Sequence, residues 1–93
     1  MTDTNLDSPT KDDSKIINTL IEVDSSMISA VKYDPDDKTL EVWFKSGARW
    51  AYYDVPFSEF KGLLESDSQG RYMRNNIIDC YSDALLGKKG RRR

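Results

Sequence analysis

The chain has 93 residues, which suits one domain and leaves no room for two. It contains no histidine and a single cysteine, Cys80, so zinc-finger sites, Ser–His and Cys–His nucleophile pairs and an internal disulfide are excluded. The net charge of -2 conceals an uneven distribution, because residues 1–15 carry -2, residues 16–87 carry -5 and residues 88–93 carry +5.

This charge pattern bears on the partners of the protein. An acidic body repels phosphate at long range, so nucleic-acid binding would require the basic tail or a local basic patch. The chain shows no secretory leader and no apolar run near the roughly 20 residues of a membrane span, and we expect a cytoplasmic protein with no membrane partner. Without a catalytic pair or metal motif, we also expect no enzymatic activity, no metal, no cofactor and no small-molecule substrate.

The first 15 residues are polar and lack periodicity, and we predict a disordered acidic N-terminal segment over residues 1–15. The domain is predicted over residues 16–86. Its first stretch, "IINTLIEV", fits either a short strand or an amphipathic turn. The Ser25–Ser26 pair that follows is more typical of backbone hydrogen bonding than of nucleophilic catalysis.

Three strands are predicted next. "MISAVKY" is followed by Asp34 and Pro35, which suit the first two positions of a type I turn. "TLEVWFK" alternates apolar and polar residues and is therefore a strand with two distinct faces. Ser46 and Gly47 suit a two-residue hairpin loop, after which "ARWAYY" forms the third strand.

The length of that loop determines the faces of the third strand. With a two-residue loop, Trp43 lies opposite Trp50, and Trp43, Trp50 and Tyr52 share one face of the sheet. The other face then carries Leu40, Val42, Phe44, Ala51 and Tyr53. A loop one residue longer would move the side chains of the third strand to the opposite faces.

Two helices are predicted after the sheet. The first begins with Pro56 at its first position and carries Phe57, Phe60 and Leu64 on one stripe. The second begins at the N-cap Ser68, repeats apolar residues through Leu85, and ends at Gly87. Its apolar stripe includes Cys80 as a small buried residue. The predicted fold class is therefore α+β, a three-stranded antiparallel β-meander followed by two α-helices packed on the sheet, with a basic tail over residues 87–93.

From about Val23 to Tyr81, the sequence resembles the KTSC domain, a family named for its occurrence at the C-terminus of some lysyl-tRNA synthetases. The resemblance is carried by Ser25-Ser26, Tyr33, Leu40-x-Val42-x-Phe44, Ser46-Gly47, an aromatic-x-Tyr motif, Val55-Pro56 and Ser68-x-Gly70-x-Tyr72. The family's central Tyr-x-Tyr is Trp50-Ala51-Tyr52 in this chain. The resemblance implies a stand-alone copy of this module, with RNA binding as the suggested activity and without the chemistry of the synthetase.

The predicted aromatic face has three interpretations. A helix covers it as part of the core, which is the ordinary outcome in a small domain. Alternatively it is an interface for a partner protein or a second copy. In the third interpretation it is a platform on which the bases of single-stranded RNA stack.

We take a binding module for RNA or another single-stranded nucleic acid as the leading hypothesis, with a protein-interaction module as the alternative. At the start of the second helix, Arg71 and the neighbouring backbone N–H groups either meet an anion or serve in capping. The candidate nucleic-acid contacts are Trp43, Lys45, Arg49, Trp50, Tyr52, Arg71, Lys88, Lys89, Arg91, Arg92 and Arg93.

Overall fold

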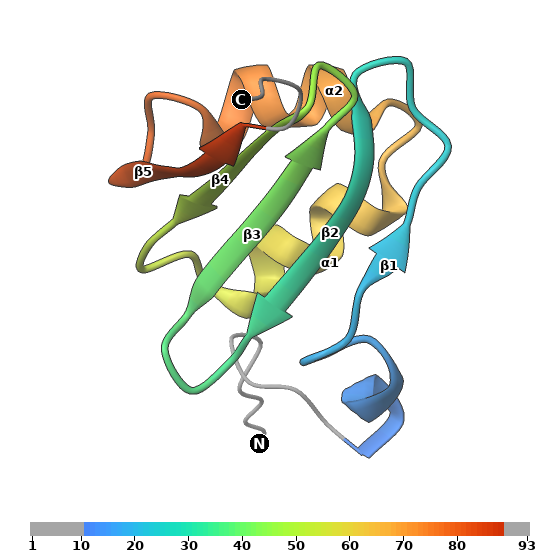
Figure 1. Cartoon of the computed structure of the whole chain (residues 1–93). Coiled ribbons are helices and arrows are strands. Elements are labelled where there is room, and N and C mark those ends of the chain that lie inside the picture. The colour runs from blue at the N-terminus through green and yellow to red at the C-terminus, as the bar shows by residue number, and fades with distance from the viewer. Residues whose placement is uncertain (1–10, 89–93) are drawn as a thin grey trace.

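Antiparallel strand pairing organises the chain, and a computed structural model describes residues 11–88, without the side chains of Asp12 and Lys88. The elements are the 3₁₀ helix η1 (Lys11–Lys15), β1 (Ile21–Glu22), β2 (Ile28–Asp34), β3 (Thr39–Phe44), β4 (Ala48–Tyr52), α1 (Phe57–Glu65), α2 (Gln69–Tyr72), the π-helical η2 (Met73–Ile77) and β5 (Asp83–Lys88). The five strands form one antiparallel sheet in the order β1-β2-β3-β4-β5 (Figure 1).

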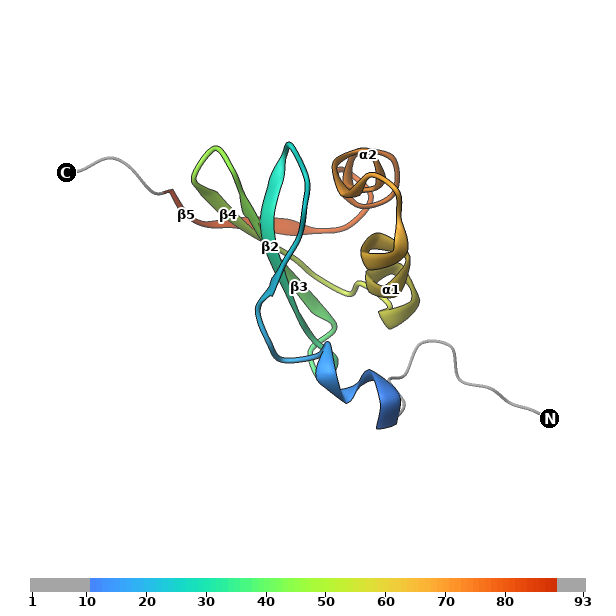
Figure 2. The ribbon, with the colours of Figure 1, turned by 90° about the vertical axis from the view of Figure 1, so that its right-hand side faces the viewer.

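Both α-helices pack on the same face of the sheet, as Figure 2 shows from the side. The predicted α+β class is therefore confirmed, but the three-stranded meander is smaller than the observed sheet. β1 adds one strand beside β2, and β5 adds another beside β4. The opposite face, which Figure 1 presents with α1 behind the sheet, is covered by none of the helices among residues 11–88.

The second helix is shorter than predicted, and its extension through Leu85 is wrong. The backbone N–H of Ile78 donates to the carbonyl of Met73 in a π-turn, and Asp79 then adopts a left-handed conformation with φ of 67°. Cys80 is exposed in the following turn rather than buried on a stripe. Residues 83–88 leave the helical path because the open edge of β4 offers them a ladder of backbone hydrogen bonds, which overrides local helix propensity.

Two described elements lie partly or wholly in segments that were predicted to flank the domain. The predicted disordered segment, residues 1–15, contains η1, which is linked to α1 by an ion pair of 3.5 Å between Asp13 and Lys61. The predicted tail, residues 87–93, overlaps β5 at its first two positions. Residues 1–10 and 89–93 lie outside the described part of the chain.

The β3–β4 pairing departs by one residue from the predicted register. Trp50 lies opposite Val42, and Arg49, not Trp50, lies opposite Trp43. The loop contains three residues, 45–47, and Gly47 occupies its left-handed position with φ of 103°. The prediction that Trp43, Trp50 and Tyr52 share one face is therefore wrong.

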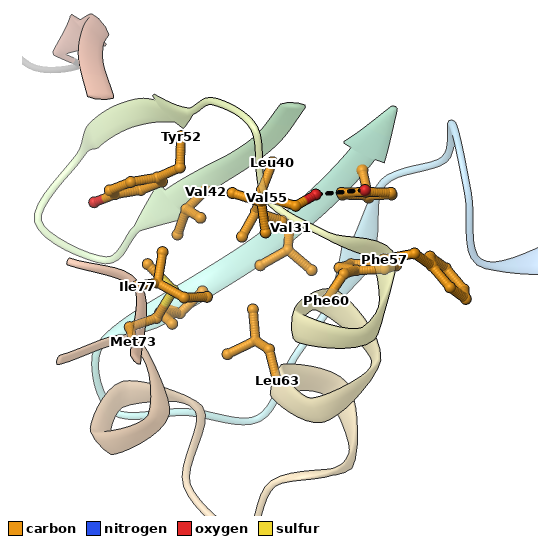
Figure 3. Packing of buried hydrophobic residues seen from close by; sticks show 12 residues of the cluster. Val31, Leu40, Val42, Tyr52, Val55, Phe57, Phe60, Leu63, Met73 and Ile77 are labelled. Carbon is orange, nitrogen blue, oxygen red and sulfur yellow. Dashed lines mark hydrogen bonds between the residues drawn. The ribbon is translucent and has the colours of Figure 1, made fainter. Parts of the chain in front are cut away.

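The core lies between the sheet and the helices and gathers the apolar residues of both layers (Figure 3). Tyr33 is fully buried, its ring stacks on Phe60 at 4.9 Å between centroids, and its hydroxyl donates to the carbonyl of Val55 at 2.6 Å. Phe57 is buried as expected in α1, whereas Leu63 rather than Leu64 occupies the fully buried position. Pro56 stands one residue earlier than predicted, as the N-cap of α1.

Replacing Gly47 with alanine is expected to lower the free energy of unfolding by about 1–2 kcal/mol, because a side chain is strained in left-handed backbone. Urea denaturation measures the change. Gly87→Ala is the matched control, since a methyl group at Gly87 meets no atom within 4 Å, and we expect a change below about 0.5 kcal/mol. Equal destabilisation by the two substitutions would contradict the role assigned to the turn.

Candidate nucleic-acid interface

Trp43 and Arg49 form a cross-strand pair on the sheet face opposite the helices, since their strand neighbours Val42 and Trp50 pack with the core. The guanidinium carbon of Arg49 lies 5.2 Å from the centroid of the Trp43 ring, within the range of a cation–π interaction. Glu41, next on the same face, accepts a hydrogen bond from Nη2 of Arg49 at 3.3 Å. The guanidinium is therefore held over the indole ring, while the Arg49 side chain remains 43% exposed.

A hollow of about 580 Å³ lies beside this pair and is lined by Ser29, Trp43, Phe44, Lys45, Gly47, Arg49 and Gly87. It combines one aromatic ring of the open face with two cationic side chains. Nε of Arg49 is buried and has no hydrogen-bond partner within the described part of the chain. Phosphate and π-systems are the groups that such a combination attracts.

The basic tail of the chain begins at the same end of the sheet. Ala48 and Arg49 pair with Lys88 and Gly87, so β5 runs alongside the start of β4 and ends there. The predicted contacts of Lys88, Lys89, Arg91, Arg92 and Arg93 involve side chains outside those that the structure describes.

The other end of the open face is acidic. Asp34, Asp37 and Glu41 line a second hollow of about 340 Å³, together with the single lysine Lys32 and the exposed ring of Tyr53. The open face is therefore polarised along β3, with carboxylates near the β2–β3 turn and cations near the β3–β4 turn. A polyanion meets attraction only at the second of these ends.

Trp50 and Tyr52, two of the predicted aromatic contacts, lie on the helix-facing side of the sheet. Tyr52 is only 3% exposed, and Trp50 is partly buried against the core. The interpretation that the aromatic residues belong to the core is thus right for these two and wrong for Trp43. Gly47 suits both turn lengths, because each needs a residue with positive φ, so no local signal in the sequence separates the two registers.

Arg71 lies apart from the Trp43 corner, on a helix of the opposite layer, and is exposed. The hydroxyl of Ser68 accepts from its backbone N–H at 3.3 Å, so capping uses the group proposed for anion binding. Gly70 packs tightly, because a Cβ there would lie 3.2 Å from the Cβ of Met27. The Ser-x-Gly-x-Tyr motif therefore serves packing and capping at this point.

Glu59 ties α1 to the segment that follows it. Its two carboxylate oxygens accept hydrogen bonds from the hydroxyls of Tyr72 and Tyr81, the latter at 3.0 Å. Burial and the hydrogen bond to Glu59 raise the pKa of Tyr72 to about 12. Ser25 has a comparable structural role, because its hydroxyl accepts from the backbone N–H groups of Met27 and Ile28.

Among the described residues, no group of three or more histidine, cysteine or acidic side chains is arranged to hold a metal ion. Within the same residues, no helix has the length and apolar character needed to cross a membrane.

The pKa of Tyr52 predicts how stability responds to alkaline pH. Burial, followed by the charges of Asp83 and Asp79, raises this pKa to about 12 from the ordinary value of 10. The folded chain therefore holds the phenolic proton more tightly than the unfolded chain, so this contribution is complete below pH 10 and is lost as the pH rises to about 12. Tyr52→Phe should show a smaller decline over this window in urea denaturation.

Tyr53→Phe is the control for that experiment, because it removes a phenol hydroxyl from an exposed ring. If Tyr52→Phe and the original chain lose stability in parallel across the window, the assignment to Tyr52 is wrong.

Sequence comparison places these features in a family. The sequence profile of the KTSC domain matches residues 24–81, more than half of the chain. A protein of Tsukamurella paurometabola is 43% identical over 56 residues, which cover 60% of this chain and 82% of the relative. An uncharacterised protein of Stutzerimonas stutzeri is 42% identical over 52 residues, which cover 56% of this chain and 73% of the relative.

Two further relatives extend the comparison. A lysine–tRNA ligase of Nostoc is 33% identical over 58 residues, which cover 62% of this chain but only 10% of the ligase. The crystal structure of a KTSC domain protein from Yersinia pestis matches with a TM-score of 0.72 and 28% identity, covering 74% of this chain and 97% of that protein. Sequence and structure thus agree on the same family.

Proposed function

Because the chain belongs to the KTSC domain family, we propose that it is a non-enzymatic binding module for single-stranded RNA. The observation that carries the proposal is the corner formed by Trp43, Lys45 and Arg49, which line one hollow on the open face of the sheet. The similarity to a segment of a lysine–tRNA ligase supports RNA as the nucleic acid, since that relative is named for an RNA.

In this proposal, an unpaired base stacks on the Trp43–Arg49 pair. Indole rings and guanidinium planes both serve as stacking surfaces for bases, and each stacked base contributes roughly 1–3 kcal/mol. The hollow of about 580 Å³ lies in the size range of small-ligand sites and suits one nucleotide. The ion pair with Glu41 orients the guanidinium before the base arrives.

The phosphate backbone then follows the cations of the same corner. Lys45 and Arg49 contact the phosphates beside the stacked base, and the tail cations Lys88, Lys89, Arg91, Arg92 and Arg93 extend the attraction beyond the sheet. The carboxylates at the opposite end of the open face repel phosphate, so the strand leaves toward the tail. Trp50, Tyr52 and Arg71 have no part in this proposal, because they lie on the helix side of the sheet.

Two single-tryptophan proteins test where the base stacks. In Trp50→Phe the remaining reporter is Trp43, and we expect saturable fluorescence quenching by a single-stranded RNA oligonucleotide. In the matched protein Trp43→Phe the reporter is Trp50, and we expect little quenching and binding weaker by roughly 1–3 kcal/mol because the stacking surface is lost. Equal quenching of the two reporters would contradict the assignment to the open face.

The absence of quenching in both proteins would contradict the proposal that this protein binds RNA. The protein-interaction alternative would then stand, favoured by the exposed side chains of Leu85 and Leu86 on the edge strand β5.

Salt dependence separates the tail from the sheet. Replacing the five tail cations with glutamine should reduce the slope of log K against log salt by up to about 3.5, since each cation paired with a single strand contributes about 0.7. Quenching of Trp43 should persist at low salt, because stacking does not depend on the tail. Complete loss of Trp43 quenching in this variant would mean that the sheet does not bind RNA by itself.

A further inference from the structure

A separate hollow lies on the helix-facing side of the β3–β4 hairpin, across the sheet from Trp43. It has a volume of about 340 Å³ and is lined by Phe44, Ser46, Ala48, Trp50, Tyr52, Ile78, Asp79 and Asp83. Three of these side chains are aromatic and two are carboxylates, and none is lysine or arginine. The hollow therefore combines ring faces with negative charge and offers no counter-ion of its own.

The aromatic wall is built by the register of the hairpin. Trp50 and Tyr52 face the helices because they pair with Val42 and Leu40, and Phe44 continues the same face. Figure 3 shows the Tyr52 ring at the margin of the core, with its hydroxyl directed away from the other labelled side chains.

The two carboxylates lie between the end of η2 and the first residue of β5. Asp79 occupies the left-handed position of the turn, with φ of 67°, and Asp83 opens β5 directly opposite Tyr52. Both are close enough to the phenol of Tyr52 to raise its pKa. Within residues 11–88, neither aspartate forms an ion pair or a hydrogen bond through its side chain.

We propose that this hollow binds the guanidinium group of an arginine presented by another polypeptide. Aromatic rings attract a cation through their faces, and two carboxylates can accept hydrogen bonds from the same guanidinium. Arginine fits better than lysine because its planar group stacks on rings, carries five N–H donors and is more weakly hydrated than an ammonium. The inference is independent of RNA binding, since it concerns the opposite side of the sheet.

The test uses the full-length chain carrying Trp43→Phe, in which Trp50 in the wall of the hollow is the only tryptophan. The probes are three capped Gly-X-Gly peptides, where X is arginine, lysine or the uncharged isostere citrulline. The arginine peptide should change Trp50 fluorescence saturably, with citrulline at least about tenfold weaker and lysine weaker than arginine. Equal or stronger responses to citrulline or lysine would overturn the proposal.

Paired substitutions identify the carboxylates. Asp79→Asn with Asp83→Asn removes both charges at little steric change, and asparagine tolerates the left-handed backbone at position 79. We expect at least about a tenfold loss of affinity for the arginine peptide. Asp54→Asn is the matched control, because Asp54 is also exposed and left-handed, with φ of 58°, but does not line the hollow. The proposal fails if the double variant binds as tightly as the control.

The arginines of the chain itself require one further comparison. The titration is repeated on a protein in which Arg91, Arg92 and Arg93 are replaced with glutamine. Similar responses with both tails support binding of a partner's arginine. If Trp50 responds to the arginine peptide only after these replacements, the hollow is occupied by the chain's own arginines. If Trp50 responds with neither tail, the hollow does not bind arginine. Either result overturns the proposal.

Discussion

The three-residue turn between β3 and β4 determines which side chains of the hairpin can meet a ligand. Gly47 adopts left-handed backbone with φ of 103°, and its N–H donates to the carbonyl of Phe44 at 2.9 Å. The N–H of Lys45 donates to the carbonyl of Met27, which fastens the turn to the entrance of β2. Since successive side chains of a strand point to opposite faces, a shift of one residue would exchange the two sides of β4.

The register of the β3–β4 pair places the aromatic side chains of the hairpin on two different faces of the sheet. Trp50 and Tyr52 join the core on the helix side, where large rings compensate for the small size of the domain. Trp43 is left on the open side with Arg49, at the end of the sheet where β5 finishes. One face of the hairpin therefore supports stability, while the other presents an aromatic ring beside cations.

Several motif residues that carry the family resemblance have structural roles in this chain. Ser68 caps α2, Gly70 allows close packing, and Tyr33 donates to the carbonyl of Val55 inside the core. A family defined by such positions shares a fold, and ligand choice is then set by other side chains. The charged side chains also differ between the two sides of the sheet, with cations beside Trp43 and carboxylates beside Trp50. The two sides therefore suit ligands of opposite charge.

Local physical chemistry was sufficient to predict much of the molecule. Alternation of apolar residues identified β3, and a turn was predicted after β2 at Asp34–Pro35, where the carboxylate of Asp34 accepts from the backbone N–H of Asp36 at 2.9 Å. Ser68 was recognised as an N-cap. These features depend on residues close together in the chain.

The remaining features depended on tertiary structure. Residues 83–88 fit a helical repeat by spacing, but pairing with β4 satisfies more backbone groups and makes them a strand. Likewise, "KSGARW" is compatible with two hairpin loops, and packing of Trp50 and Tyr52 under the helices selects one of them. The sequence by itself determined the fold class and the residue types available for binding; the tertiary structure decided which of them share a surface, because register and edge pairing are settled by contacts between distant segments.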